Sequence, residues 1–275
     1  MRGVLRNRLL AFAAAIVGLQ VALALGAAWI APYDPTAQSI IARLKAPSAA
    51  HWLGTDQLGR DVLTRILHGY RTSLMACLAS VGAALLVGGA LGLLSAYYRG
   101  WLDRVTMRIM DVLFAFPVML LAIGVIAVLG PRAESAAVAI AVVYTPIFAR
   151  LLRGPALVIC ESEYVAGARA IGASDLRILL HHVLPNLASV ILVQASLLLS
   201  AAILVEASLS FLGLGVQPPT PSLGLMLSEG RNFLMLSPWS AIFSGLAILF
   251  LSFGFNLLGD ALRDTLDPRL RGSTD

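Results

Sequence analysis

Six long apolar stretches, separated by shorter polar segments, make up most of this chain. They lack the alternation of apolar and polar residues typical of membrane-spanning β-strands, and most approach the about 20 apolar residues that a helix needs to cross a bilayer. The pattern therefore predicts an all-α integral membrane protein with about six transmembrane helices. We place the spans at residues 9–30, 73–98, 105–129, 135–152, 187–209 and 239–258.

The composition leads to the same class of protein. Hydrophobic residues make up 59% of the chain, charged residues only 13%, and the mean hydropathy is +0.85. A soluble domain of this length could not bury so much apolar surface. The net charge of +5 is scattered rather than gathered in a patch, so nucleic-acid binding is not indicated. Cys77 and Cys160 have no metal-ligand spacing, and we expect two free thiols.

The distribution of basic residues predicts the orientation. The first apolar run is too long for a signal peptide and is not followed by a small-residue cleavage site, so we expect a retained span. With the N-terminus inside, 13 basic residues fall on the cytoplasmic side and 7 on the other. Because positive loops stay in the cytoplasm, both chain ends are predicted to be cytoplasmic.

This orientation suggests two parts of the chain. Residues 1–72 form an N-terminal span plus a periplasmic segment. Residues 73–275 form a five-helix core with a cytoplasmic loop at 154–186 and a second periplasmic segment at 213–238.

The loop carries the most informative stretch, residues 163–185. Its alanines favour helix, Gly172 permits a positive φ at a helix end, and Ser174 can cap the next helix. Pro185 then marks the entry to the fifth span. Two short helices that meet at a glycine and protrude from the membrane have the shape of a docking knob.

This stretch resembles the EAA loop of ABC importer permeases, whose pattern ends in a glycine and, after a fixed spacer, an apolar residue and Leu-Pro. Counting back from Leu184-Pro185 lands on Gly172. The family's Glu-Ala-Ala aligns here with Ala166-Gly167-Ala168, and its apolar position falls on His182. The alternative is an ordinary amphipathic surface loop. The resemblance assigns coupling to an ATPase to Glu163, Tyr164, Ala166, Gly167, Ala168, Arg169, Gly172, Asp175, Leu184 and Pro185.

A second motif, Leu53-Gly-Thr-Asp56 followed by Gly59-Arg60-Asp61, resembles a signature of the dipeptide/oligopeptide/nickel branch of these permeases. Locally, Thr55 or Asp56 can cap a following turn, and Arg60 can pair with Asp61. We expect an interfacial structural element rather than a substrate contact.

Further stretches resemble the same family, so that the markers together run from about residue 32 to residue 271. They are Met107 to Asp111 with Ala115-Phe116-Pro117, Glu206 to Gly215, Asn256 to Asp264, and Leu266-Asp267-Pro268.

Polar groups inside the spans have both a functional and a structural interpretation. Asp111 is expected to pair with Arg104 or Arg108 at the cytoplasmic end. Gly88 and Gly92 form a close-packing site for another helix. The residues that either line a pathway or bond a neighbouring helix are Gln194, Ser196, Ser200 and Glu206.

The sequence carries no catalytic equipment of its own. Its single lysine, Lys45, is not part of a phosphate-binding loop, and the motifs of metalloproteases and serine hydrolases are missing, which argues against an intramembrane enzyme. A secondary transporter would normally show inverted repeats, and we find no clear one. We predict no catalytic residue, no metal site and no cofactor.

The resemblance implies the type I ABC importer permease fold and a permease subunit that translocates short peptides by alternating access. A nickel or chelated-metal importer of the same family is the alternative. The implied partners are a homologous second permease subunit, two ATP-binding subunits that hydrolyse ATP, an extracytoplasmic solute-binding protein and membrane lipid. The implied location is the bacterial cytoplasmic (inner) membrane.

Overall fold

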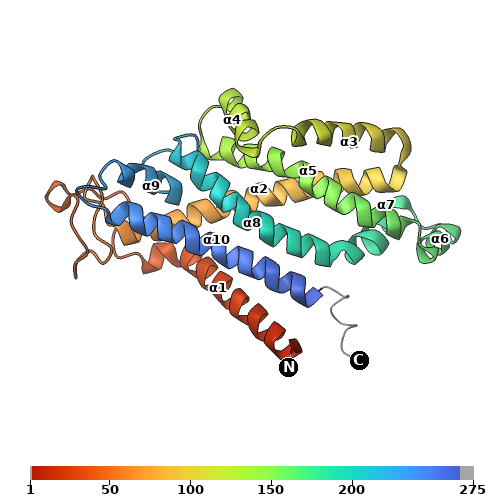
Figure 1. Cartoon of the computed structure of the whole chain (residues 1–275), viewed down its shortest axis with the longest axis horizontal. Helices are drawn as coiled ribbons and strands as arrows, with labels where there is room; N and C mark the ends of the chain where they lie inside the picture. Colours follow the sequence, from red (N-terminus) through yellow and green to blue (C-terminus); the bar gives the residue numbers. More distant parts are fainter. Residues whose placement is uncertain (1, 267–275) are drawn as a thin grey trace.

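The computed structural model describes residues 2–266, and this part of the chain is a helical bundle without a named strand (Figure 1). The α-helices are α1 (Arg2–Ile30), α2 (Val62–Tyr98), α3 (Gly100–Phe114), α4 (Val118–Leu129), α5 (Ala133–Cys160), α6 (Glu163–Ala170), α7 (Asp175–Arg177), α8 (Ala188–Phe211), α9 (Leu223–Arg231) and α10 (Trp239–Leu266). Shorter helical turns occupy Ile40–Ala42, Ile178–Val183 and Leu184–Leu187. The motif residues Asp267 and Pro268 lie outside the described residues.

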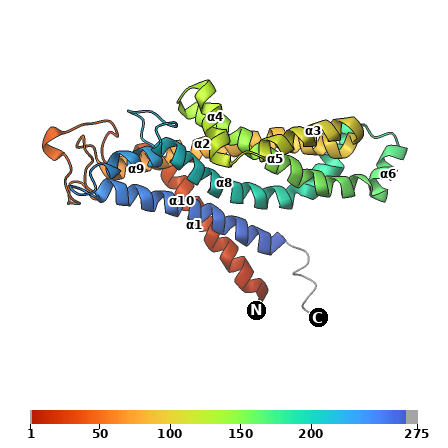
Figure 2. The ribbon, with the colours of Figure 1, turned by 45° about the horizontal axis from the view of Figure 1, so that its top comes forward.

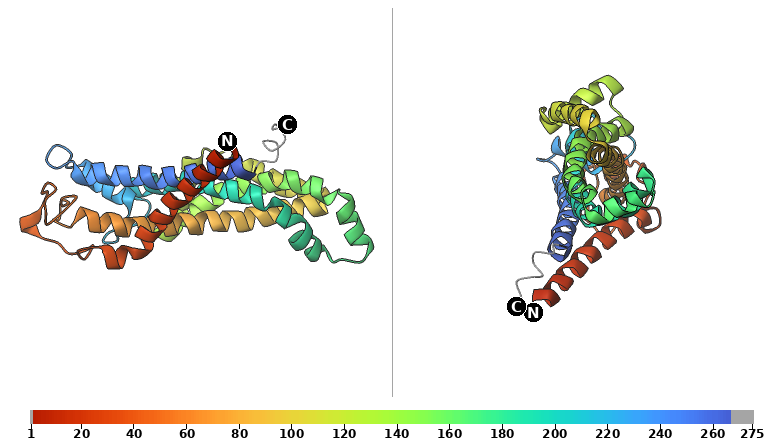
Figure 3. Two further views of the ribbon diagram at one scale, coloured as in Figure 1. Left: turned by 90° about the horizontal axis from the view of Figure 1, so that it is seen from below. Right: turned by 90° about the vertical axis from the view of Figure 1, so that its right-hand side faces the viewer.

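The bundle is elongated, with α6 at one end and α9 at the other, here called the α6 end and the α9 end (Figure 1). α2, α5 and α10 run from the α9 end toward the α6 end, whereas α1, α3 and α8 run the opposite way (Figure 1). The α3–α4 pair lies on the face opposite α1, which crosses the outside of the bundle (Figures 2 and 3). Gln20 fixes α1 to α10 by donating a 2.6 Å hydrogen bond to the Phe250 carbonyl.

Five of the described helices are long and apolar enough to cross a membrane, and the count reaches six if the bent pair α3 and α4 forms one span. The two helices of this pair meet at 97°. The prediction of one continuous third span was therefore wrong in detail. The break falls at Ala115–Pro117, where proline supplies no N–H for helix continuation.

The second and fourth spans are longer than predicted. α2 begins at Val62, capped by Asp61, whose carboxylate accepts a 2.8 Å hydrogen bond from the Thr64 N–H. The expected boundary between residues 72 and 73 thus falls inside a continuous helix. α5 runs on to Cys160, so the first residues of the predicted loop at 154–186 are its last turns.

α2 and α5 pack closely against each other. A Cβ placed on Gly88 would stand 2.3 Å from the Thr145 carbonyl oxygen, and one on Gly92 would stand 2.4 Å from that of Ala149. Small residues let helix backbones approach in this way. The predicted close-packing site is confirmed, and the core around it includes the fully buried Phe148.

Replacing Gly92 by alanine should loosen this contact. The added methyl group forces α2 and α5 apart, at an expected cost of about 1–3 kcal/mol, which thermal unfolding of the purified permease in detergent measures as a lower Tm. Gly82→Ala, on the same helix with nothing within 4 Å of the added Cβ, is the control and should not lower the Tm. Equal Tm values for the two variants would contradict the close approach.

Candidate coupling site

Residues 163–185, here called the coupling segment, form a compact projection at the α6 end (Figure 1). α6 ends where the Gly172 N–H donates to the Arg169 carbonyl and the Ala173 N–H to the Ala168 carbonyl, both at 3.0 Å. This pattern requires a left-handed residue, and Gly172 has a φ of +83°. The predicted positive φ of Gly172 at a helix end is confirmed. Because a Cβ there would meet nothing within 4 Å, the requirement comes from the backbone and not from space.

The rest of the segment differs in detail from the expected pair of helices. α7 spans only three residues, and Ser174 takes the N-cap position without a side-chain hydrogen bond. A π-helical turn, Ile178–Val183, and a 3₁₀ turn, Leu184–Leu187, then lead into α8. Pro185 stands at the entry to the fifth span, as predicted.

A small hydrophobic core fixes the inner face of the coupling segment to α2 and α5. It includes Val165 and Ala168 of α6, so the Ala168 side chain packs inward and does not lie on the outer surface. The core residues are Ala96, Leu152, Ala156, Cys160, Val165, Ala168, Ile178, Leu179, Val183 and Leu187. The segment is therefore packed firmly against the ends of α2 and α5.

Two tyrosines at the end of α2 add polar contacts. Tyr97 and Tyr98 donate hydrogen bonds of 2.6 and 3.1 Å to the two carboxylate oxygens of Asp175. The Arg169 guanidinium lies 4.8 Å from the centre of the Tyr97 ring, a cation–π contact. Asp175 and Arg169 were predicted site residues. The sequence analysis missed the tyrosines, because no local pattern connects the end of a span with a loop 77 residues further on.

The outer face of the segment carries apolar side chains that nothing in the described chain covers. Ile171 is 86% exposed and Leu176 66% exposed. Neither was predicted, although both lie within the coupling segment, because the assignment followed the positions of the family motif. The predicted residues that are also exposed are Glu163, Tyr164, Ala166, Gly167, Arg169, Gly172, Asp175 and Pro185; Leu184 is half-buried.

The four polar residues of α8 do not share one environment. Ser196 donates to the Leu192 carbonyl of its own helix, and the Ser200 hydroxyl lies 2.9 Å from that of Ser252 on α10. For Ser200 the structural alternative therefore applies. Gln194, in contrast, lines a cavity of about 430 Å³ between α5, α8 and α10. Lining of a pathway by Gln194 stays a prediction.

Glu206 is buried and belongs to a chain of contacts that fixes the loop after α8. Its carboxylate accepts a 2.7 Å hydrogen bond from the Ser210 hydroxyl, which in turn accepts one from the Val216 N–H at 3.4 Å. The motif from Glu206 to Gly215 thus shapes the turn at the α9 end. The Ser73 hydroxyl and the second Glu206 carboxylate oxygen are both buried without a partner among the described residues.

The second sequence motif forms a buried ion network at the α9 end. Asp56 accepts a 2.7 Å hydrogen bond from Arg60 Nε and pairs also with Arg65, and both arginines reach Glu229 of α9, at 3.0 and 3.3 Å. Burial raises the pKa of Glu229, against the effect of Arg60. The expected pair of Arg60 with Asp61 is not formed. The network ties the segment before α2 to α9, which agrees with the expected structural role.

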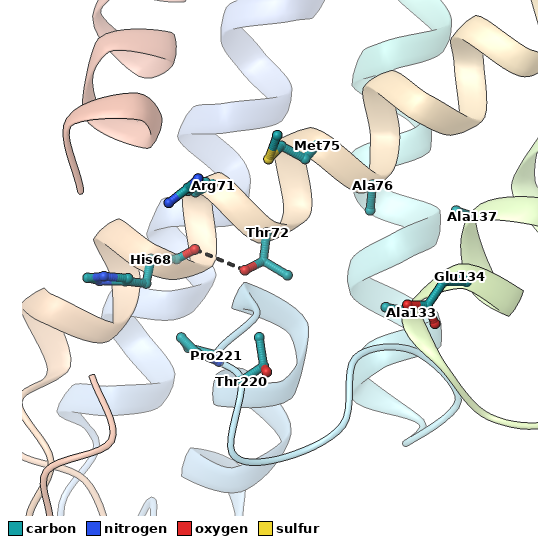
Figure 4. A pocket seen from close by; sticks show the side chains of 10 residues that line it. All are labelled: His68, Arg71, Thr72, Met75, Ala76, Ala133, Glu134, Ala137, Thr220 and Pro221. Carbon is teal, nitrogen blue, oxygen red and sulfur yellow. Dashed lines mark hydrogen bonds between the residues drawn. The ribbon is translucent and has the colours of Figure 1, made fainter. Parts of the chain in front are cut away.

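A cavity of about 510 Å³ opens beside this network, between α2, the start of α5 and residues 220–221 (Figure 4). His68 and Arg71 line its α2 side, and Glu134 lies across from them on α5. Among residues 2–266, no group of three or more His, Cys, Asp or Glu side chains is placed to hold a metal ion.

Comparison with known proteins agrees with this architecture. The family described as "binding-protein-dependent transport system inner membrane component" matches residues 88–272. The glutathione transport system permease protein GsiD of Pectobacterium atrosepticum is 48% identical over 271 residues, covering 98% of this chain and 90% of that protein. The dipeptide transport system permease protein DppC of Alkalihalophilus pseudofirmus is 47% identical over 229 residues, covering 83% and 75%.

A solved structure shares the fold. The inward-facing MetNI methionine ABC transporter contains a chain that superposes with a TM-score of 0.59 at 19% identity, covering 75% of this chain and 97% of that one. The multi-pass helical bundle, the family match and the extent of the similarity to GsiD and DppC lead to one conclusion: this chain belongs to the family of binding-protein-dependent transport system inner membrane components.

Proposed function

We propose that this chain is the permease subunit of an importer for short peptides, and that the coupling segment docks onto an ATP-binding subunit. One observation carries the docking assignment: the segment presents exposed Ile171 and Leu176 on a tip that is firmly held by a core and by Asp175. Exposed apolar patches rimmed by polar groups are typical of protein interfaces. The peptide cargo rests on the glutathione and dipeptide relatives, which favour it over nickel.

The α6 end then faces the cytoplasm and the α9 end faces the periplasm of a bacterial inner membrane. This orientation agrees with the excess of arginine expected on the cytoplasmic side. In this orientation the loop that contains Lys45 lies on the periplasmic side, at the opposite end from the coupling segment. The Lys45 N–H donates a hydrogen bond to the Thr55 hydroxyl there. With no phosphate-binding loop in its sequence, the permease relies on two partner subunits for ATP hydrolysis.

The way in which the coupling segment is attached supports alternating access. α6 begins at Glu163, shortly after α5 ends at Cys160, and α8 begins shortly after the segment ends. A displacement of the segment by a closing ATPase pair therefore reaches two long helices at once. These helices would move against the homologous second permease and switch the opening between the two sides of the membrane, with substrate delivered by a solute-binding protein.

Ile171→Glu should weaken docking without changing the fold, because the side chain is 86% exposed. A carboxylate in an apolar interface would lose its water without gaining a partner. We therefore expect the affinity for the ATPase subunits to fall at least tenfold, or about 1.4 kcal/mol. Binding of purified ATPase to the permease in nanodiscs measures it. Met235→Glu, a similar change at a 98% exposed position outside the segment, is the control and should bind normally. Equal affinity of the two variants would refute docking at this tip.

Gly172→Val should impair both transport and the ATP hydrolysis that substrate stimulates. Valine disfavours a φ of +83° by roughly 1–2 kcal/mol, so the turn between α6 and α7 shifts. We expect substrate-stimulated ATPase and uptake to fall together at normal complex levels. Gly154→Val, at an open helical position of α5, is the matched control. Full activity of Gly172→Val would show that this turn is not part of the coupling.

The cargo can be tested directly in proteoliposomes that contain the complete importer and its solute-binding protein. We expect ATP-dependent accumulation of a labelled dipeptide or glutathione, with competition by unlabelled short peptides and none by Ni²⁺ alone. Accumulation of nickel, free or chelated, without any uptake of peptide would replace the peptide assignment by its alternative.

A further inference from the structure

A row of ion pairs joins α3 to α5 on the side of the bundle nearest the α6 end. Arg153 forms two parallel 2.5 Å hydrogen bonds to the carboxylate of Asp103, from Nε and Nη2. Arg150 pairs with Asp111, and its guanidinium lies 4.5 Å from the centre of the Phe114 ring. The sequence analysis expected Asp111 to pair with an arginine of its own helix. In the structure, both carboxylates instead pair with arginines of α5.

These pairs are the main specific contacts that position α3. Only Thr106 and Met110 of its fifteen residues are buried, so little apolar packing holds this helix. A bidentate arginine–carboxylate pair fixes both the distance and the orientation between two helices, whereas an apolar contact lets them slide past each other. α3 runs antiparallel to α5, and its two aspartates contact α5 within one turn, at Arg150 and Arg153.

The two helices lead to different parts of the molecule. Beyond Arg153, α5 continues to Cys160 and then into the coupling segment. Beyond Asp111, α3 ends at the bend before Pro117, and α4 follows at 97°. α4 is apolar, and only Ala122 and Ile126 are buried in this chain.

A third ion pair ties the start of α3 to the connection between α5 and α6. Arg99, in the turn between α2 and α3, pairs at 2.7 Å with Glu161, which lies between α5 and α6. Arg99 has a positive φ of 54°, and its partner Glu161 lies two residues before the coupling segment. A shift of α6 therefore displaces α3 from its first residue onward.

We propose that Asp103 and Asp111 are positioning residues that transmit displacement of α5 to the α3–α4 pair, so that α4 moves when the coupling segment is displaced. The inference rests on the proposed function. Asp111 and Arg150 are 52% and 41% exposed, so water can solvate them when they separate. This pair can therefore re-form with each cycle, and it links the α3–α4 pair, in which few residues are buried, to α5.

The test uses the complete importer in nanodiscs, with Cys77 and Cys160 replaced by alanine. Spin labels at Val128→Cys on α4 and Leu86→Cys on α2, both exposed positions, report the distance between these helices without ATP and in the trapped ATP state. In the otherwise native importer we expect the distance to change. In Asp103→Asn/Asp111→Asn we expect the change to be lost and uptake per ATP hydrolysed to fall at least about fivefold, the lower end of typical coupling factors.

Two further variants separate transmission from a structural role. The exchanged pair Asp111→Arg/Arg150→Asp should restore much of the uptake and the distance change that Asp111→Arg alone removes. Arg108→Gln removes an exposed charge from the same helix, at a residue without an ion pair among the described residues, and should behave as the native importer.

Three results would overturn the inference. The first is an α2–α4 distance that does not change in the native importer during ATP trapping, and the second is normal uptake and a normal distance change in Asp103→Asn/Asp111→Asn. The third is the loss of both ATPase binding and uptake in every aspartate variant, which would indicate a role in folding alone. The proposed function fails separately, if the native importer does not take up substrate or if Ile171→Glu binds its ATPase normally.

Discussion

The close contact between α2 and α5 is the interaction on which the rest of the structure depends. Gly88 and Gly92 bring the α2 backbone against the carbonyls of Thr145 and Ala149, so these helices act as one rigid unit through the membrane. In lipid, apolar side chains gain nothing from helix association as such, and close van der Waals contact has to replace the hydrophobic effect. The ends of both helices pack against the coupling segment, and the pair therefore forms a firm base for the proposed docking surface.

The polar contacts around this helix pair are distributed according to the free energy needed to desolvate them. Within the bundle they are hydroxyl pairs such as Ser200 with Ser252, which need little desolvation. Full charges occur near the two ends of the bundle, in the buried network around Asp56 and in the more exposed pairs of α3 with α5. The two ends thus differ in kind: the buried network at the α9 end is hard to separate, whereas the more exposed Asp111–Arg150 pair can open at small cost.

Much of the fold was predictable because lipid imposes a simple rule on the sequence. Apolar runs gave the spans, and Gly172 predicted the turn of the coupling segment, since only a residue tolerant of positive φ fits there. The start of α2 was missed because Arg65 interrupts the apolar pattern, and its charge is compensated by Glu229, far away in the sequence. The bend before Pro117 was missed because the apolar run continues through it. Contacts such as Tyr97 with Asp175 depend on tertiary structure and leave no local pattern.

The difference between buried and exposed charge also fits the proposed movement at the α6 end. A contact that has to loosen and re-form during such a movement cannot rely on a deeply buried ion pair, since each opening would leave unpaired charges in a medium of low dielectric constant. Asp111 and Arg150 are about half exposed, so water replaces each partner as the other leaves. Asp56 and Arg65, which are almost completely buried, have no such replacement and hold α9 and the start of α2 together. The same type of contact thus serves as a fixed joint at one end and as a reversible link at the other, and burial decides between the two.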